Sequence, residues 1–142
     1  KKSATSFAIS AELAVRSGDF NKGFKMYSKA IELDPMSPSL YLSRAEVSWL
    51  IEDVKFGIQS ENKRDFLRLQ DYNKAIELLE SDSDQIKRYN QLFPKKLPKA
   101  FFDRAFQKHL LGDNDGASSD GLKSKELGHP KEELAKLPID FN

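Results

Sequence analysis

The chain has 142 residues, the size of one domain or a short repeat array, and its 23 Lys and Arg against 22 Asp and Glu leave a formal net charge of +1. A hydrophobic fraction of 39% that includes ten Phe can form a core, which argues against wholesale disorder. The balanced charge argues against broad nucleic-acid binding, which needs an excess of Lys and Arg. The absence of cysteine excludes disulfide frameworks, thiol nucleophiles and cysteine zinc sites.

The hydropathy pattern predicts a soluble protein. No run approaches the roughly 18 apolar residues of a membrane span, and the start Lys1-Lys2-Ser3 lacks the apolar stretch of a signal peptide. Since the first residue is not Met, we expect a processed or shortened product, from which a targeting segment could already have been removed. A cysteine-free chain suits reducing and oxidising compartments, so the location stays open, with the cytoplasm slightly favoured over a processed exported form.

Helix signals in the first half of the chain begin and end at recognisable residues. Asp34-Pro35 closes one helix, because the residue before proline is pushed out of the helical region. Ser37-Pro38 predicts a cap followed by proline at the first position of the next helix. An apolar stripe then predicts a long helix over about 62–80, formed by Phe66, Leu69, Tyr72, Ile76 and Leu79.

Two shorter helices are predicted in the second half. Ser83-Asp84 starts one that runs to about Leu92, and Pro94 and Pro98 separate it from the next segment. Pro130 opens a helical turn or two, with Glu132 and Glu133 at the positive end of the helix dipole.

The chain contains an internal repeat. Residues 29–33 (KAIEL) recur letter for letter as residues 74–78, and residues 41–45 (YLSRA) recur in outline as residues 101–105 (FFDRA). In the segment from Gly18 to Pro35, the Gly-Asp-aromatic turn, the small and aromatic residues around Ala30 and the closing proline occupy the positions that they have in the tetratricopeptide repeat family. The chain resembles this family, whose 34-residue unit is a helix, a turn and a second helix.

Spacing supports the resemblance. In a regular array of this family the small residue of a first helix precedes that of the second helix by 19 positions, and the next follows after 15. Ala11 to Ala30 is 19, Ala30 to Ala45 is 15, and Ala105 to Ser124 is again 19. The steps from Ala45 to Ala75 and from Ala75 to Ala105 are both 30, which indicates an 11-residue enlargement and a 15-residue insert.

The resemblance implies an all-α, right-handed helical-repeat solenoid within a single domain of residues 1–142. We expect three tetratricopeptide-like helix pairs at about 4–37, 38–82 and 98–131, an inserted helix in 83–97, and a short C-terminal cap in 130–142. Both helices of the second unit are expected to be longer than normal. Stacking of the pairs would create the core, because one pair cannot bury its own apolar face.

The resemblance also implies a function, namely a protein-interaction scaffold that buries a partner peptide or helix in the groove lined by the first helices. The positions that would face this groove are Thr5, Ala8, Glu12, Val15, Ser39, Leu42, Glu46, Trp49, Lys99, Phe102, Phe106 and His109. Among them we predict partner-binding roles for Leu42, Glu46, Trp49, Lys99, Phe102, Phe106 and His109. Their aromatic members could instead pack on the enlarged second unit or on the insert.

An alternative function is a structural or accessory subunit of a larger assembly, which would contact its partners through the convex face or the 83–97 insert. The insert carries Ile86, Tyr89, Leu92 and Phe93 at helical spacing, and could cover the join between the second and third units or present its own surface.

Some family members grip the C-terminal carboxylate of chaperones with Lys, Asn and Arg side chains. The corresponding residues here are Ala8, Glu12, Ser43, Lys99 and Asp103, of which only Lys99 matches. Because Glu12 and Asp103 would repel a carboxylate, we do not expect chaperone tails as partners.

No enzymatic, metal or cofactor site is predicted. His109 and His129 are the only histidines and lack metal-ligand spacing. The adjacent Glu132 and Glu133 point to different faces of a helix. Gly112, Gly116 and Gly121 follow no strand and carry no phosphate-loop ending, so they are interpreted as repeat-turn glycines.

Overall fold

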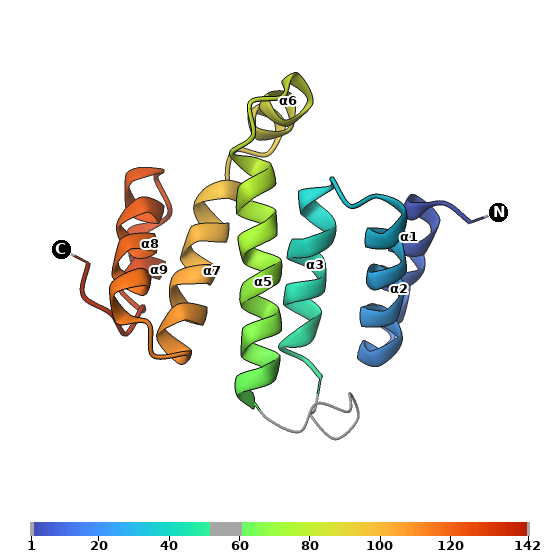
Figure 1. Cartoon of the computed structure of the whole chain (residues 1–142), viewed down its shortest axis with the longest axis horizontal. Coiled ribbons are helices and arrows are strands. Elements are labelled where there is room, and N and C mark those ends of the chain that lie inside the picture. The colour runs from blue at the N-terminus through green and yellow to red at the C-terminus, as the bar shows by residue number, and fades with distance from the viewer. Residues whose placement is uncertain (1, 52–60, 142) are drawn as a thin grey trace. The chain divides into compact units, whose positions relative to one another are not determined.

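The chain folds into α-helices joined by short turns. A computed structural model describes residues 2–51 and 61–141, which contain eight helices and no strand (Figure 1). This confirms the all-α class. The helices are α1 (Ala4–Arg16), α2 (Phe20–Leu33), α3 (Pro38–Ser48), α5 (Glu61–Leu79), α6 (Asp84–Leu92), α7 (Lys96–Leu110), α8 (Asn114–Glu126) and α9 (Lys131–Leu134). They group into two compact units, one extending to Asp71 and the other beginning at Tyr72, so α5 contributes to both.

In the first unit, local hydrogen bonds set the limits of α1 and α2. The Ser3 hydroxyl accepts from the Ser6 amide at 3.1 Å and the Ser6 hydroxyl accepts from the Ser3 amide at 3.0 Å, which forms a capping box at the start of α1. Gly18 has φ of 86°, a left-handed conformation that side chains disfavour, and it turns the chain after α1. Asp19 then caps α2 by accepting from the Lys22 amide at 3.2 Å.

The start of α3 agrees only in part with prediction. Pro38 takes the expected first position, but the Ser37 side chain makes no capping bond and its hydroxyl lies 3.2 Å from that of Ser39. The predicted elongation of this helix is wrong, since α3 has 11 residues. It ends because the amides of Trp49 and Leu50 bond carbonyls three residues back, at 3.2 and 2.9 Å, which tightens the last turn. The inferred 11-residue enlargement of the second unit stays a prediction, because residues 52–60 lie outside the described residues.

Helix α5 confirms the long helix predicted over 62–80, with 19 residues. Tyr72, Ile76 and Leu79 of the predicted stripe are buried, with at most 2% of each residue exposed. Phe66, the first member, is 53% exposed, because the inward position on that turn of the helix is held by Arg68, which is 1% exposed.

The second unit repeats the turn chemistry of the first. Gly112 has φ of 85° and precedes Asp113, whose carboxylate accepts from the Gly116 amide at 2.9 Å and caps α8. The predicted short helix 84–92 is confirmed as α6, which the Ser83 hydroxyl caps by accepting from the Ile86 amide at 3.2 Å. The predicted turn after Pro130 is confirmed as α9.

The spacing series of small residues lies in the core. Each of its six members has an exposed fraction of 0%, namely Ala11, Ala30, Ala45, Ala75, Ala105 and Ser124. Small side chains allow helices to pack closely, and the buried Ser124 hydroxyl is satisfied by donating to the Pro98 carbonyl at 2.9 Å. The helical-repeat class of the fold is thereby confirmed, whereas the division into three units, an insert and a cap stays a prediction.

A repeated arginine bridge joins the helices inside each unit. In the first unit, Arg44 Nε and Nη2 donate to the two carboxylate oxygens of Asp71 at 3.0 and 2.6 Å, and its Nη1 donates to Ser28 Oγ at 3.2 Å. In the second unit, Arg104 Nε and Nη2 donate to Asp120 at 2.7 and 2.8 Å, and its Nη1 donates to Asn73 at 3.1 Å.

The two bridges occupy equivalent repeat positions. Each arginine directly precedes the small residue of its helix, and each aspartate lies four positions before the small residue of its own helix. Ser28 and Asn73 each lie two positions before theirs. Bidentate arginine–carboxylate contacts are directional, so the same geometry recurs where the sequence repeats.

Candidate functional site

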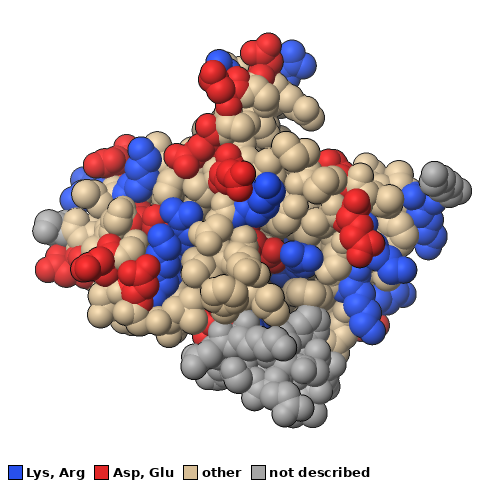
Figure 2. Space-filling model, viewed as in Figure 1, with Lys and Arg blue, Asp and Glu red and all other residues tan. Residues whose placement is uncertain are grey.

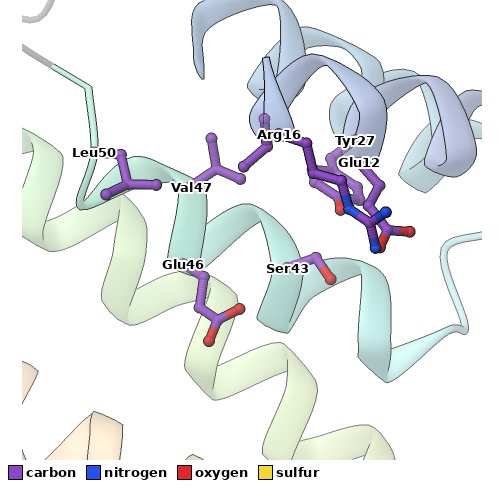
Figure 3. Close-up of a pocket in the computed structure, with 8 residues that line it drawn as sticks. Glu12, Arg16, Tyr27, Ser43, Glu46, Val47 and Leu50 are labelled. Carbon is purple, nitrogen blue, oxygen red and sulfur yellow. The ribbon is translucent and has the colours of Figure 1, made fainter. Parts of the chain in front are cut away.

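A hollow in the first unit is lined by residues of its first three helices. Its volume is about 630 Å³. Figure 3 shows Glu12, Arg16 and Tyr27 together on one side of it, and Ser43, Glu46, Val47 and Leu50 along α3 and its end. The described residues that line it are Glu12, Val15, Arg16, Tyr27, Ser43, Glu46, Val47 and Leu50.

Helical periodicity brings these side chains to one place. Glu12, Val15 and Arg16 are spaced i, i+3, i+4 and therefore share one face of α1. Ser43, Glu46, Val47 and Leu50 follow the same spacing on α3 and in the tight turn that ends it. Tyr27 reaches the hollow from α2 and is itself 9% exposed.

The charges at the hollow are predominantly negative. Arg16 Nη2 donates to Glu12 Oε1 at 2.7 Å, and both side chains are well exposed. Glu46 is exposed and has no ion-pair partner among the residues that the structure describes. Two carboxylates and one guanidinium leave one net negative charge on the part of the lining that the structure describes.

Tyr27 experiences the charge of both carboxylates. Burial raises the pKa of its hydroxyl above the ordinary value of 10.0, a hydrogen bond with the Ser43 side chain lowers this pKa, and the charges of Glu12 and Glu46 raise it further. At neutral pH the hydroxyl is therefore protonated, and the negative charges of both glutamates act on it.

Of the partner-binding residues predicted in the first unit, one lines this hollow. Glu46 does so, together with Glu12 and Val15, which were also expected to face the groove. Leu42 is half-buried and outside the lining. Trp49 is 41% exposed, and the Arg68 guanidinium carbon lies 3.4 Å from its ring centroid.

The contact with Arg68 gives Trp49 a structural role. Arg68 is buried, its Nε donates to Ser48 at 2.7 Å and its Nη1 to Asp65 at 2.8 Å. The indole covers this buried cation, which is a favourable cation–π arrangement. Trp49 therefore packs on Arg68 of the second predicted repeat unit (38–82), and its partner-binding role stays a prediction.

The predicted partner-binding residues of the second compact unit, which begins at Tyr72, lie on α7. Phe102 and Phe106 are half-buried and pack with Ala105 against Leu134 and Leu137 of the C-terminal segment. The ring of Phe102 also lies 4.5 Å from that of His129, centroid to centroid. These two aromatics therefore contact the segment predicted as the C-terminal cap, which was not among the packing partners that the sequence analysis named for them.

The polar site residues of α7 have different surroundings. Lys99 Nζ lies 2.8 Å from Asp103 Oδ2, so the one cation that matched the chaperone-tail grip is neutralised by its own neighbour. His109 is half-buried near the end of the helix.

Tyr27 and Ser43 are functional candidates that the groove pattern missed. Tyr27 lies on a second helix, whereas only first-helix positions were expected to face a groove. The repeated aromatic position shortly before Ala30 could have indicated it. Ser43 was considered only as the counterpart of a chaperone-binding Asn.

Residues 2–51 and 61–141 contain no cluster of three or more His, Asp or Glu suited to holding a metal ion. Within the same residues, no helix has both the length and the apolar character needed to cross a membrane. On the face seen in Figure 2, Lys and Arg are interspersed with Asp and Glu.

Comparisons with known proteins agree with the helical architecture. No family model matches the chain, and no curated protein matches it. Among solved structures, the chain is similar to the N-terminal domain of stress-induced protein-1 (STI-1) from C. elegans, with a TM-score of 0.68 and 23% sequence identity. The alignment covers 94% of this chain and 91% of that one. This likeness supports a tetratricopeptide-like helical-repeat fold.

Proposed function

We propose that the chain is a protein-interaction module that binds a segment of a partner protein in the hollow of α1, α2 and α3. The observation that carries the proposal is the hollow itself, which combines the apolar side chains of Val15, Val47 and Leu50 with a polar edge at Glu46 and Ser43. Binding sites for peptides and other ligands have this combination of apolar surface and a few directed polar groups. Its mechanism is noncovalent burial of the partner segment.

Filling the hollow tests this function. Peptide phage display on the wild-type protein would supply ligands, whose affinities are then measured by fluorescence anisotropy for Ser43→Phe and for Ser119→Phe. The first places a ring in the hollow, and the second places the same ring on an exposed position of α8. We expect at least about tenfold weaker binding for Ser43→Phe only, with an unchanged helical circular dichroism signal. Equal affinity of all three proteins would refute binding in the hollow.

Helix α6 supports the alternative of an accessory subunit. Leu92 is 68% and Phe93 is 48% exposed, while Ile86 is buried and Asn90 Nδ2 donates to the Leu79 carbonyl at 2.9 Å. Ile86 and Asn90 thus anchor the helix, while Leu92 at its C-terminal end and the following Phe93 stay exposed. If Phe93→Ser abolishes binding of the selected peptides while Ser43→Phe does not, α6 is the interaction surface.

A further inference from the structure

The chemistry of the hollow restricts the kind of segment that it can accept, given the proposed function on which this inference rests. One side of the hollow is apolar and is formed by Val15, Val47 and Leu50. Val15 is half-buried, Val47 is 4% exposed and Leu50 is 50% exposed. The carboxylate of Glu46 stands next to this surface without an ion-pair partner among the described residues.

Every helix that faces the hollow contributes to its polarity. Helix α1 supplies Glu12, which Arg16 already pairs at 2.7 Å, and α2 supplies the neutral hydroxyl of Tyr27. Helix α3 supplies Ser43 and Glu46. Among the described lining residues the one cation, Arg16, is engaged with Glu12, so Glu46 is the carboxylate of this set that is left to bind an incoming charge.

This arrangement excludes two classes of ligand side chain. A carboxylate or phosphate group would meet the net negative charge of the described lining, with Glu46 unpaired among these residues, and like charges at short range repel. A purely apolar side chain would cover Glu46 without replacing its water, and an unpaired charge is costly to desolvate. A long cationic side chain avoids both costs, because its methylene groups can lie on apolar surface while its charged end reaches a carboxylate.

We propose that the hollow of α1, α2 and α3 binds a Lys or Arg side chain of a partner segment, with its stem on Val15, Val47 and Leu50 and its cationic group on Glu46. A volume of about 630 Å³ also admits the residues on either side of that Lys or Arg. Glu46 sets the charge preference, and Ser43 and Tyr27 supply hydroxyl oxygens near it.

A positional-scanning library of nonapeptides tests this preference. Each pool fixes one residue at one position, and bound pools are quantified on the immobilised full chain for wild type, Glu46→Gln and Glu32→Gln. The control residue Glu32 is exposed on α2, outside the lining, so both variants lose the same charge. We expect Lys and Arg pools to be enriched by wild type and Glu32→Gln, and their binding to Glu46→Gln to fall by about threefold to tenfold.

Four outcomes would overturn the inference in distinguishable ways. Enrichment of acidic or purely apolar pools would refute the cationic ligand and leave groove binding intact. Enrichment of Lys and Arg that is unchanged in Glu46→Gln would place the cation elsewhere. Failure of every pool to bind would refute the proposed function itself. Dimerisation of the free chain that Glu46→Gln abolishes would identify a second copy as the occupant and refute a foreign partner.

Discussion

The arginine bridge of the first compact unit should contribute to the free energy of unfolding through strong coupling between Arg44 and Asp71. Asp71 has an 8% exposed side chain that receives two bonds from Arg44, whose side chain is 23% exposed. Arg44→Met keeps most of the alkyl packing but leaves the carboxylate buried without its cation. Breaking such a buried pair costs about 3–5 kcal/mol, which the partial exposure of Arg44 reduces to about 2–3 kcal/mol.

A double-mutant cycle measures this coupling. We expect the double variant Arg44→Met/Asp71→Asn to be more stable than the sum of the single changes predicts, by about 1.5 kcal/mol or more. Urea unfolding followed by fluorescence is suitable, because the single Trp of the chain, Trp49, lies in the same unit. Additive effects within about 0.5 kcal/mol would refute the bridge as an energetic unit.

The second bridge provides an internal comparison. Asp120 is approached by Lys108 Nζ at 3.0 Å in addition to Arg104. Because a cation remains when Arg104 is replaced, Arg104→Met should destabilise the protein less than Arg44→Met. A larger loss for Arg104→Met would contradict this argument.

Four further predictions follow from individual contacts. Burial raises the pKa of Asp71 above 3.8, so the folded state holds this proton to higher pH than the unfolded state, and stability from this group should fall as pH rises from about 3.8 through the folded pKa. Urea unfolding of wild type and Asp71→Asn at several pH values would detect this pH-dependent part of the free energy of unfolding. The raised pKa of Tyr27 likewise predicts that stability falls as pH increases above 10.0, and Tyr27→Phe should remove that loss. In Gly121→Ala, the new Cβ would lie 2.9 Å from Phe141 Cδ1 and 3.3 Å from Ile139 Cδ1, so amide exchange of residues 139–141 should accelerate by about tenfold or more, as measured by mass spectrometry. Phe102→Ala should lower the free energy of unfolding by about 2 kcal/mol, because Phe102 packs on the C-terminal segment, and should leave peptide binding in the hollow unchanged.

The repeat in the sequence predicted the helical framework well. Ala11, Ala30 and Ala45 could be identified as packing positions because their spacing follows helix and turn lengths, and all three are fully buried. Gly18 and Gly112 were predictable as turns from their place between the helices of a repeat. In the structure both occupy the left-handed conformation that glycine permits.

Other features depend on contacts that periodicity does not encode. The contact of Phe102 with Leu134 and Leu137 lies outside the repeat pattern, because the predicted C-terminal cap carries no repeat signature. The partner-binding role of Phe102 stays a prediction. The burial of Arg68 was equally hidden, because its Ser48 and Asp65 partners and its Trp49 contact arise only in the folded unit. Glu46 lines the hollow from the first-helix position that the resemblance placed toward a groove, and its partner-binding role stays a prediction.

The most direct test of binding in the hollow is a nuclear magnetic resonance titration of the isotopically labelled chain with an Arg-containing peptide from the library. The largest chemical-shift changes should occur at Glu12, Tyr27, Ser43 and Glu46, which line the hollow. Changes confined to α6, around Leu92 and Phe93, would contradict this location and support the accessory-subunit alternative instead.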